Sequence, residues 1–164
     1  MRDIRKPDND FQHLYPPFGA KVKAAVDMLN IYLKDPKTGY AKYPAFPKAA
    51  LFEGYRSVAR QEWLYQQGRT REGDIVTKSR TPKYHGFGLA ADIAFRTPLC
   101  EWTWDAPDAC WNLWGHCVRA QGLEWAGDWK RFPEGPHCQP KPAACLLWRP
   151  QARQYLNNLG LKTP

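Results

Sequence analysis

The sequence predicts an α+β fold, a small single domain in which helices flank a largely antiparallel sheet. A chain of 164 residues suits one domain that buries about two thirds of its unfolded surface. Short strand-like runs are mixed with helical patterns outside the strand–helix–strand order of a parallel sheet. The chain contains no repeat and no linker-like stretch, so we expect residues 1–164 to form one domain.

The first half of the chain predicts two helices and a strand. A helix is expected from about 19 to 33, because apolar residues recur on one face and an Asp-Pro pair then ends the pattern. A proline-rich connection, 43–47, leads to a short strand over 50–55. Ser57 is a suitable N-cap for a second helix, which should run to Gln67 and end at a glycine.

The second half predicts a long loop, two strands and two helices. Residues 69–84 are polar and basic, which is typical of a loop, and a strand should follow over 90–95. A Trp-rich stretch then leads to a helix over 106–121 and a strand near 123–125. The last helix is expected from 150 to 159, starting at a proline.

One candidate site lies around the strand over 90–95. Because successive side chains of a strand point to opposite faces, Asp92 should lie on one face while Ile93 and Phe95 point to the core. Two glycines separate His85 from this strand and permit a tight turn that folds His85 back towards Asp92. We therefore expect the imidazole and the carboxylate to share a cleft.

A second segment, 131–137, carries the remaining candidates. It contains two prolines and a glycine, so it should be an irregular loop or edge that holds Glu134 and His137 in fixed relation. Two imidazoles and one carboxylate, from His85, Asp92 and His137, suit zinc and leave a fourth position for water. Glu134 is placed to take a proton from such a water, whose pKa the metal lowers to about 7. Singly these residues read as ordinary surface side chains, but the complete set favours a metallohydrolase.

Four motifs in this order resemble the zinc D-alanyl-D-alanine carboxypeptidases and L-alanyl-D-glutamate endopeptidases, a family that includes phage endolysins. They are the Gly-Tyr-Arg-Ser block at 54–57, His-x-x-Gly-x-Ala-x-Asp at 85–92, the Trp-Ala-Gly-Asp-Trp segment at 125–129 and the Glu-Gly-Pro-His ending at 134–137. The resemblance implies the small zinc-peptidase fold shared with hedgehog domains. It implies Zn²⁺ on His85, Asp92 and His137, Glu134 as catalytic base, and substrate contacts from Arg56, Ser57, Gln61 and Trp129. Trp129 could equally pack against the core.

Two positions depart from the family pattern. Lys83 stands where we expect a small hydroxyl residue, which affects substrate contacts near the metal. Glu134 stands where endolysin relatives often have Asp, which lengthens the base by one methylene.

The resemblance implies hydrolysis of the stem peptide of bacterial peptidoglycan. We favour the bond between L-alanine and D-glutamate, because the loop 69–84 and the Trp-rich stretch 99–114 could wall a groove open at both ends. Terminal D-Ala-D-Ala trimming is the alternative within the family. A non-catalytic zinc domain that binds peptide or protein is the alternative from another class, although such a domain has no need of Glu134.

The net charge of +8 fits either a nucleic acid or an anionic cell wall. The basic residues are scattered and form no nucleic-acid-binding motif, so we expect no specific nucleic-acid partner. The first ten residues have no apolar signal-peptide region and no run is long enough to span a membrane. By analogy with compact endolysins we expect a monomer without a wall-binding module. It would be made in the host bacterial cytoplasm and reach the wall in the periplasm with the help of a holin-like protein.

Five cysteines occur without a Cys-x-x-Cys pair. Cys110 and Cys117 fit the apolar stripe of the helix over 106–121, and Cys138 should face away from its neighbour His137. We expect all five thiols to be reduced. A disulfide between Cys100 and Cys110 after export is one alternative, and a structural zinc site built from the cysteines is another. Two further carboxylates could orient a ligand imidazole or simply make structural hydrogen bonds: Glu124 and Asp128.

Overall fold

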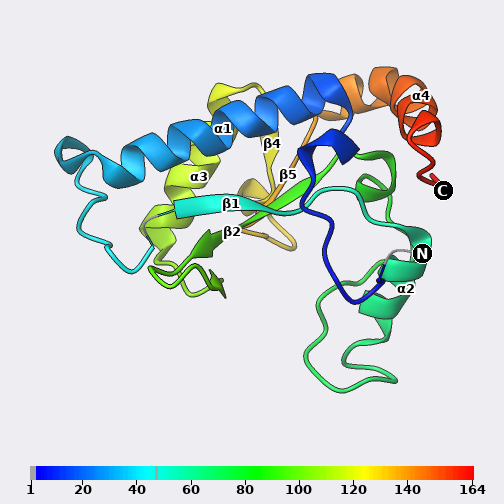
Figure 1. Ribbon diagram of the computed structural model, residues 1–164, viewed down its shortest axis with the longest axis horizontal. Coiled ribbons are helices and arrows are strands. Elements are labelled where there is room, and N and C mark those ends of the chain that lie inside the picture. The colour runs from blue at the N-terminus through cyan, green and yellow to red at the C-terminus, as the bar shows by residue number, and fades with distance from the viewer. Residues whose placement is uncertain (1–2, 47) are drawn as a thin grey trace.

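A computed structural model describes residues 3–46 and 48–164 of the chain (Figure 1). Residues 1 and 2, and residue 47 at the end of the predicted connection 43–47, lie outside the described residues.

Within residues 3–46 and 48–164, a five-stranded antiparallel sheet forms the centre of the domain, with β1, β2, β5 and β4 in spatial order and β3 paired with β2. Helices flank it, as the sequence predicts for an α+β domain (Figure 1). The strands are β1 Lys48–Glu53, β2 Ala91–Arg96, β3 Trp102–Thr103, β4 Glu124–Trp125 and β5 His137–Gln139.

The described residues also form four α-helices and four short 3-10 helices. The long helix α1 runs along the sheet beside β1, and α3 packs against α1 (Figure 1). The described residues contain no helix that is both long and apolar enough to cross a membrane. The helices are α1 Pro16–Lys34, α2 Val58–Gln66, α3 Asp108–Ala120 and α4 Pro142–Asn158, and the 3-10 helices are η1 Phe11–His13, η2 Pro36–Thr38, η3 His85–Phe87 and η4 Ala126–Asp128.

The core lies between the sheet and helices α1 and α3. The apolar stripe predicted for α1 is buried, and Ile93 and Phe95 of β2 are buried opposite it. Asn30 of α1 fixes the helix to β1, because its side chain both donates to the Ala49 carbonyl (2.9 Å) and accepts from the Ala49 N–H (2.8 Å). Ser57 caps α2 as expected, its hydroxyl accepting from the Arg60 N–H.

The last helix begins earlier than predicted. Helix α4 starts at Pro142, where the fixed φ of proline suits the first turn, and Pro150 lies inside it. Pro150 lacks the N–H that would bond the carbonyl of Leu146. Leu146 and Leu147 are exposed, so water reaches this turn and the interruption is tolerated.

Candidate metal centre

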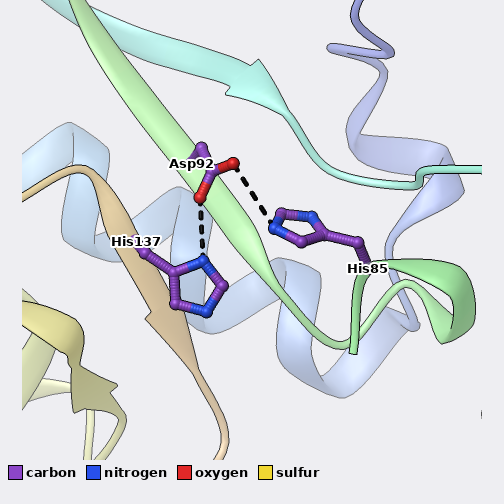
Figure 2. A group of neighbouring side chains, drawn as sticks. All are labelled: His85, Asp92 and His137. Atoms are coloured by element: carbon purple, nitrogen blue, oxygen red, sulfur yellow. Dashed lines mark hydrogen bonds and ion pairs between the residues drawn. The ribbon is translucent and has the colours of Figure 1, made fainter. Parts of the chain in front are cut away.

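His85, Asp92 and His137 converge from three segments of the chain (Figure 2). Asp92 lies between the two imidazoles. Its Oδ1 is 2.9 Å from Nδ1 of His137, and its Oδ2 is 3.3 Å from Nε2 of His85. One potential ligand atom from each residue lies within 4.8 Å of the others. These are the distances at which one cation can be shared by all three.

Local backbone geometry explains the convergence. Antiparallel pairing of β2 with β5 places His137 directly opposite Asp92. His85 begins the 3-10 helix η3, which ends at Gly88 with φ at 60°, in the left-handed region. A Cβ on Gly88 would lie 2.5 Å from the His13 carbonyl oxygen, so only glycine allows this close turn.

Hydrogen bonds on the outer nitrogens orient both imidazoles. His85 Nδ1 donates to the Gly54 carbonyl at 2.7 Å, which leaves Nε2 with its lone pair towards Asp92. Gln139 Oε1 lies 3.2 Å from His137 Nε2 and can accept a hydrogen bond from an Nε2–H, which turns the Nδ1 lone pair towards Asp92. The two rings therefore present different nitrogens to one point. Neither acceptor was identified from the sequence, because each depends on pairing between segments.

The donor set fits a metal cation. All three side chains are largely buried, and imidazole nitrogens with one carboxylate oxygen suit divalent transition metals. Burial opposes ionisation of Asp92, but the neighbouring His85 and His137 hold the pKa of its carboxyl well below the usual value. Burial, followed by the charge of Arg56, lowers the pKa of His85 and favours the neutral imidazole that a metal requires.

A cavity of about 410 Å³ opens onto this centre. The loop 69–84 forms one wall through Val76, Thr77, Ser79, Thr81, Pro82, Lys83 and Tyr84, and Arg56, Gln61, Trp129, Glu134 and Gln139 complete the lining around the three converging residues.

Glu134 lies in the cavity on a firmly held loop. Its N–H donates to the Ala126 carbonyl at 3.1 Å. The next two carbonyls accept from buried indoles, Gly135 from Trp125 Nε1 (2.7 Å) and Pro136 from Trp114 Nε1 (3.2 Å). Burial, assisted by the charge of Asp92, raises the pKa of the Glu134 carboxyl. A carboxylate of raised proton affinity is suited to base catalysis.

Arg56 borders the cavity but is held by three acceptors. Its guanidinium donates to Glu53 Oε2 from Nε (3.0 Å) and Nη2 (2.7 Å), to Asp92 Oδ2 (3.0 Å) and to Gln61 Oε1 (3.1 Å). Glu53, which no sequence motif singles out, is buried and also accepts from Arg60. Arg56 thus connects a buried ion-pair network to the cluster of His85, Asp92 and His137.

The other predicted substrate residues divide into two groups. Gln61 and Trp129 line the cavity, and the Trp129 ring lies 5.5 Å from that of His137. Ser57 borders a different cavity, beside Tyr55 and Leu161.

Glu124 and Asp128 do not orient a ligand imidazole. Glu124 Oε1 accepts from Trp129 Nε1 at 2.6 Å, and Asp128 pairs with Arg119 on the surface. Both carboxylates therefore make structural interactions, as one of the two alternatives predicted.

The cysteines lie away from the centre. All five are free thiols, and Cys138 is fully buried in the core, facing away from the cavity that its neighbour His137 enters. Within the described residues the only group of three or more potential ligands is His85, Asp92 and His137, so cysteines form no alternative metal site there.

Comparison with known proteins agrees with the motifs. Residues 77–140 match the family described as D-alanyl-D-alanine carboxypeptidase. The chain is 39% identical over 98 residues to the peptidoglycan L-alanyl-D-glutamate endopeptidase CwlK of Bacillus subtilis (strain 168). That match covers 55% of this chain and 59% of CwlK, so the chain spans about three fifths of its relative. The resemblance to this peptidase family is confirmed.

The fold is also that of a solved structure. The L-Ala D-Glu endopeptidase ChiX of Serratia marcescens matches with a TM-score of 0.51 and 20% identity, over 88% of this chain and 92% of ChiX. This likeness confirms the α+β fold with its antiparallel sheet.

Proposed function

We propose that this chain is a zinc-dependent peptidase that cuts the stem peptide of bacterial peptidoglycan between L-alanine and D-glutamate. The observation that carries the proposal is the convergence of His85, Asp92 and His137 with Glu134 in one cavity. A binding domain needs the ligands but no carboxylate of raised pKa beside them, so Glu134 favours an enzyme over a non-catalytic zinc domain.

Zinc bound by His85 Nε2, Asp92 and His137 Nδ1 would polarise the scissile carbonyl and activate a water molecule. In this proposal Glu134 takes the proton of that water and returns it to the leaving amine. Arg56 holds the Asp92 carboxylate in place through its 3.0 Å bond. Trp129, held by Glu124, forms a wall beside His137 against which substrate can pack.

Two observations favour the bond between L-alanine and D-glutamate over the D-Ala-D-Ala bond. CwlK is described as an L-alanyl-D-glutamate endopeptidase and is 39% identical to this chain over 98 residues, although the family description names carboxypeptidases. A carboxypeptidase must also bind a free terminal carboxylate. The Arg56 guanidinium already bonds Glu53, Gln61 and Asp92, so it is poorly placed to receive one.

Digestion of purified peptidoglycan, followed by mass spectrometry, tests this proposal. We expect L-alanine to remain on muramic acid and free peptides to begin with D-glutamate. Release of D-alanine alone would establish the carboxypeptidase alternative. Binding of peptide without any product from the metal-loaded protein would favour the non-catalytic domain.

A lytic, endolysin-like role is a further part of the proposal. Cutting the stem near the glycan opens the wall mesh, whereas removal of terminal D-alanine leaves it intact. We propose that the protein acts as a monomer on the wall and that a holin-like partner releases it. Its net charge of +8 suits an anionic wall. A permeabilised Gram-negative cell suspension should lose turbidity on addition of the protein, and a chelator should prevent the loss.

A further inference from the structure

A second cavity, of about 450 Å³, adjoins the loop that carries Glu134. Three indoles contribute to its lining, from Trp104, Trp111 and Trp125, together with the side chains of Asp108 and Asn112 and the backbone of Gly135. The peptidase mechanism proposed above uses none of these side chains. The lining of this cavity therefore has no part in the proposed hydrolysis.

One face of α3 builds the floor of this cavity. Asp108, Trp111 and Asn112 stand at positions i, i+3 and i+4 of the helix, which lie side by side on its surface. Trp104 enters from the segment after β3, and its ring packs edge-on against Phe52 with centroids 4.8 Å apart. Trp104 is nevertheless 43% exposed, so much of its surface is available to a ligand.

The polar side chains of the cavity are also available. Within the described part of the chain, the structure records no hydrogen bond or ion pair for the side chains of Asp108 and Asn112. A concave site with flat aromatic walls and a few unpaired polar groups is typical of small-molecule binding. A hexose ring matches it, because its apolar C–H face can cover an indole while its hydroxyl and acetamido groups meet an amide and a carboxylate.

The two cavities share a wall. Glu134 lines the metal cavity, whereas its neighbours Gly135 and Pro136 line the second one. The Gly135 backbone lies against the Trp111 ring, and its carbonyl accepts from Trp125 Nε1 at 2.7 Å. A ligand in the second cavity would thus contact the same loop that carries the proposed base.

We propose that this second cavity binds the N-acetylated sugar of the glycan strand to which the stem peptide is attached. This inference rests on the proposed function. L-alanine alone, with the lactyl group of muramic acid, separates the sugar from the bond between L-alanine and D-glutamate. One residue spans at most about 3.6 Å of extended chain, so the glycan must lie beside the catalytic cavity during cleavage. The indole-lined cavity provides a surface of suitable chemistry there.

A comparison of two substrates tests this inference. One is the disaccharide N-acetylglucosaminyl-N-acetylmuramic acid carrying the stem peptide, and the other is the same peptide with an acetylated N-terminus and no sugar. We expect kcat/KM to be higher for the glycan-bearing substrate, and Trp104→Ala and Asn112→Ala each to lower the ratio of the two values about tenfold. Trp102→Ala is the matched control, since Trp102 lies two residues away but does not line the cavity. An unchanged ratio in both cavity variants would overturn the inference.

Binding of the peptide-free disaccharide gives a readout that does not depend on hydrolysis. Saturation-transfer NMR should detect millimolar binding to the parent protein and to Trp102→Ala, with loss of the signal in Trp104→Ala. Disaccharide binding without hydrolysis of either substrate would retain the saccharide site and refute the proposed peptidase. Hydrolysis of both substrates without disaccharide binding would support the proposed peptidase and refute the saccharide site.

Discussion

Gln139 Oε1 lies 3.2 Å from Nε2 of His137, on the side of the imidazole that faces away from Asp92. An Nε2–H that donates to Gln139 leaves the Nδ1 lone pair on the side of Asp92, where a cation would bind. Because Gln139 is buried on β5, two residues after His137, the strand itself maintains the arrangement.

Replacement of Gln139 by Leu should therefore weaken metal binding. The variant keeps the size of the side chain but removes the acceptor, and loss of such a partner typically lowers metal affinity by about 10- to 100-fold. Competition with a chromophoric chelator measures the change. Gln151→Leu, on exposed surface of α4, is the control and should retain the parent affinity.

One equivalent of zinc per chain is expected from elemental analysis of the purified protein. His137→Ala should lose most of it, whereas His116→Ala should not, because His116 lies on the exposed face of α3. Stoichiometric zinc in a double variant, His85→Ala with His137→Ala, would rule out this centre.

The part of this site that sequence could predict consists of residue types at fixed spacings. The convergence of His85, Asp92, Glu134 and His137 on one cavity was predictable, because the proposed metal and proton chemistry restricts those positions to a few side chains. Gln139 and the Gly54 carbonyl were not, since their roles arise from the pairing of β2 with β5 and from the close approach of η3 to residue 54.

The same distinction applies to the fold. The helix α1 was predicted from its apolar stripe, a local pattern, and its burial confirms it. The start of α4 was missed because a proline at 150 reads as a helix start, and only the exposed position of the turn before it explains how the helix continues through it.

Thiol reactivity should distinguish one cysteine from the other four. Burial raises the pKa of Cys110, Cys138 and Cys145, and that of Cys117 to about 11, so these remain protonated and shielded at about pH 8. Cys100 is the exposed one. An aromatic disulfide reagent should titrate about one thiol rapidly in the native protein and all five after denaturation. Cys100→Ser should remove the rapid phase.

Glu53→Gln should destabilise the protein. Glu53 is buried and accepts from both Arg56 and Arg60, so the substitution leaves the Arg60 guanidinium with a neutral partner and the Arg56 guanidinium with Asp92 as its remaining anion. Removing one partner of a buried ion pair costs about 3–5 kcal/mol of the free energy of unfolding. Urea denaturation measures the loss. Glu62→Gln removes the exposed pair with Arg80 and should leave the midpoint close to that of the parent.

Glu134→Gln provides the most direct separation of enzyme from binding domain. The amide has nearly the size and polarity of the carboxyl group but cannot accept the proton of an attacking water, so hydrolysis should fall by about 10²-fold or more. The bound metal should remain, because Glu134 is not among the three converging ligands. Asp128→Asn is the matched control, since its carboxylate pairs with Arg119 on the surface, and it should retain activity. If Glu134→Gln hydrolysed peptidoglycan at nearly the parent rate with its metal in place, another base would have to serve. The next carboxylate to examine would be Glu124, which reaches the cavity only through Trp129.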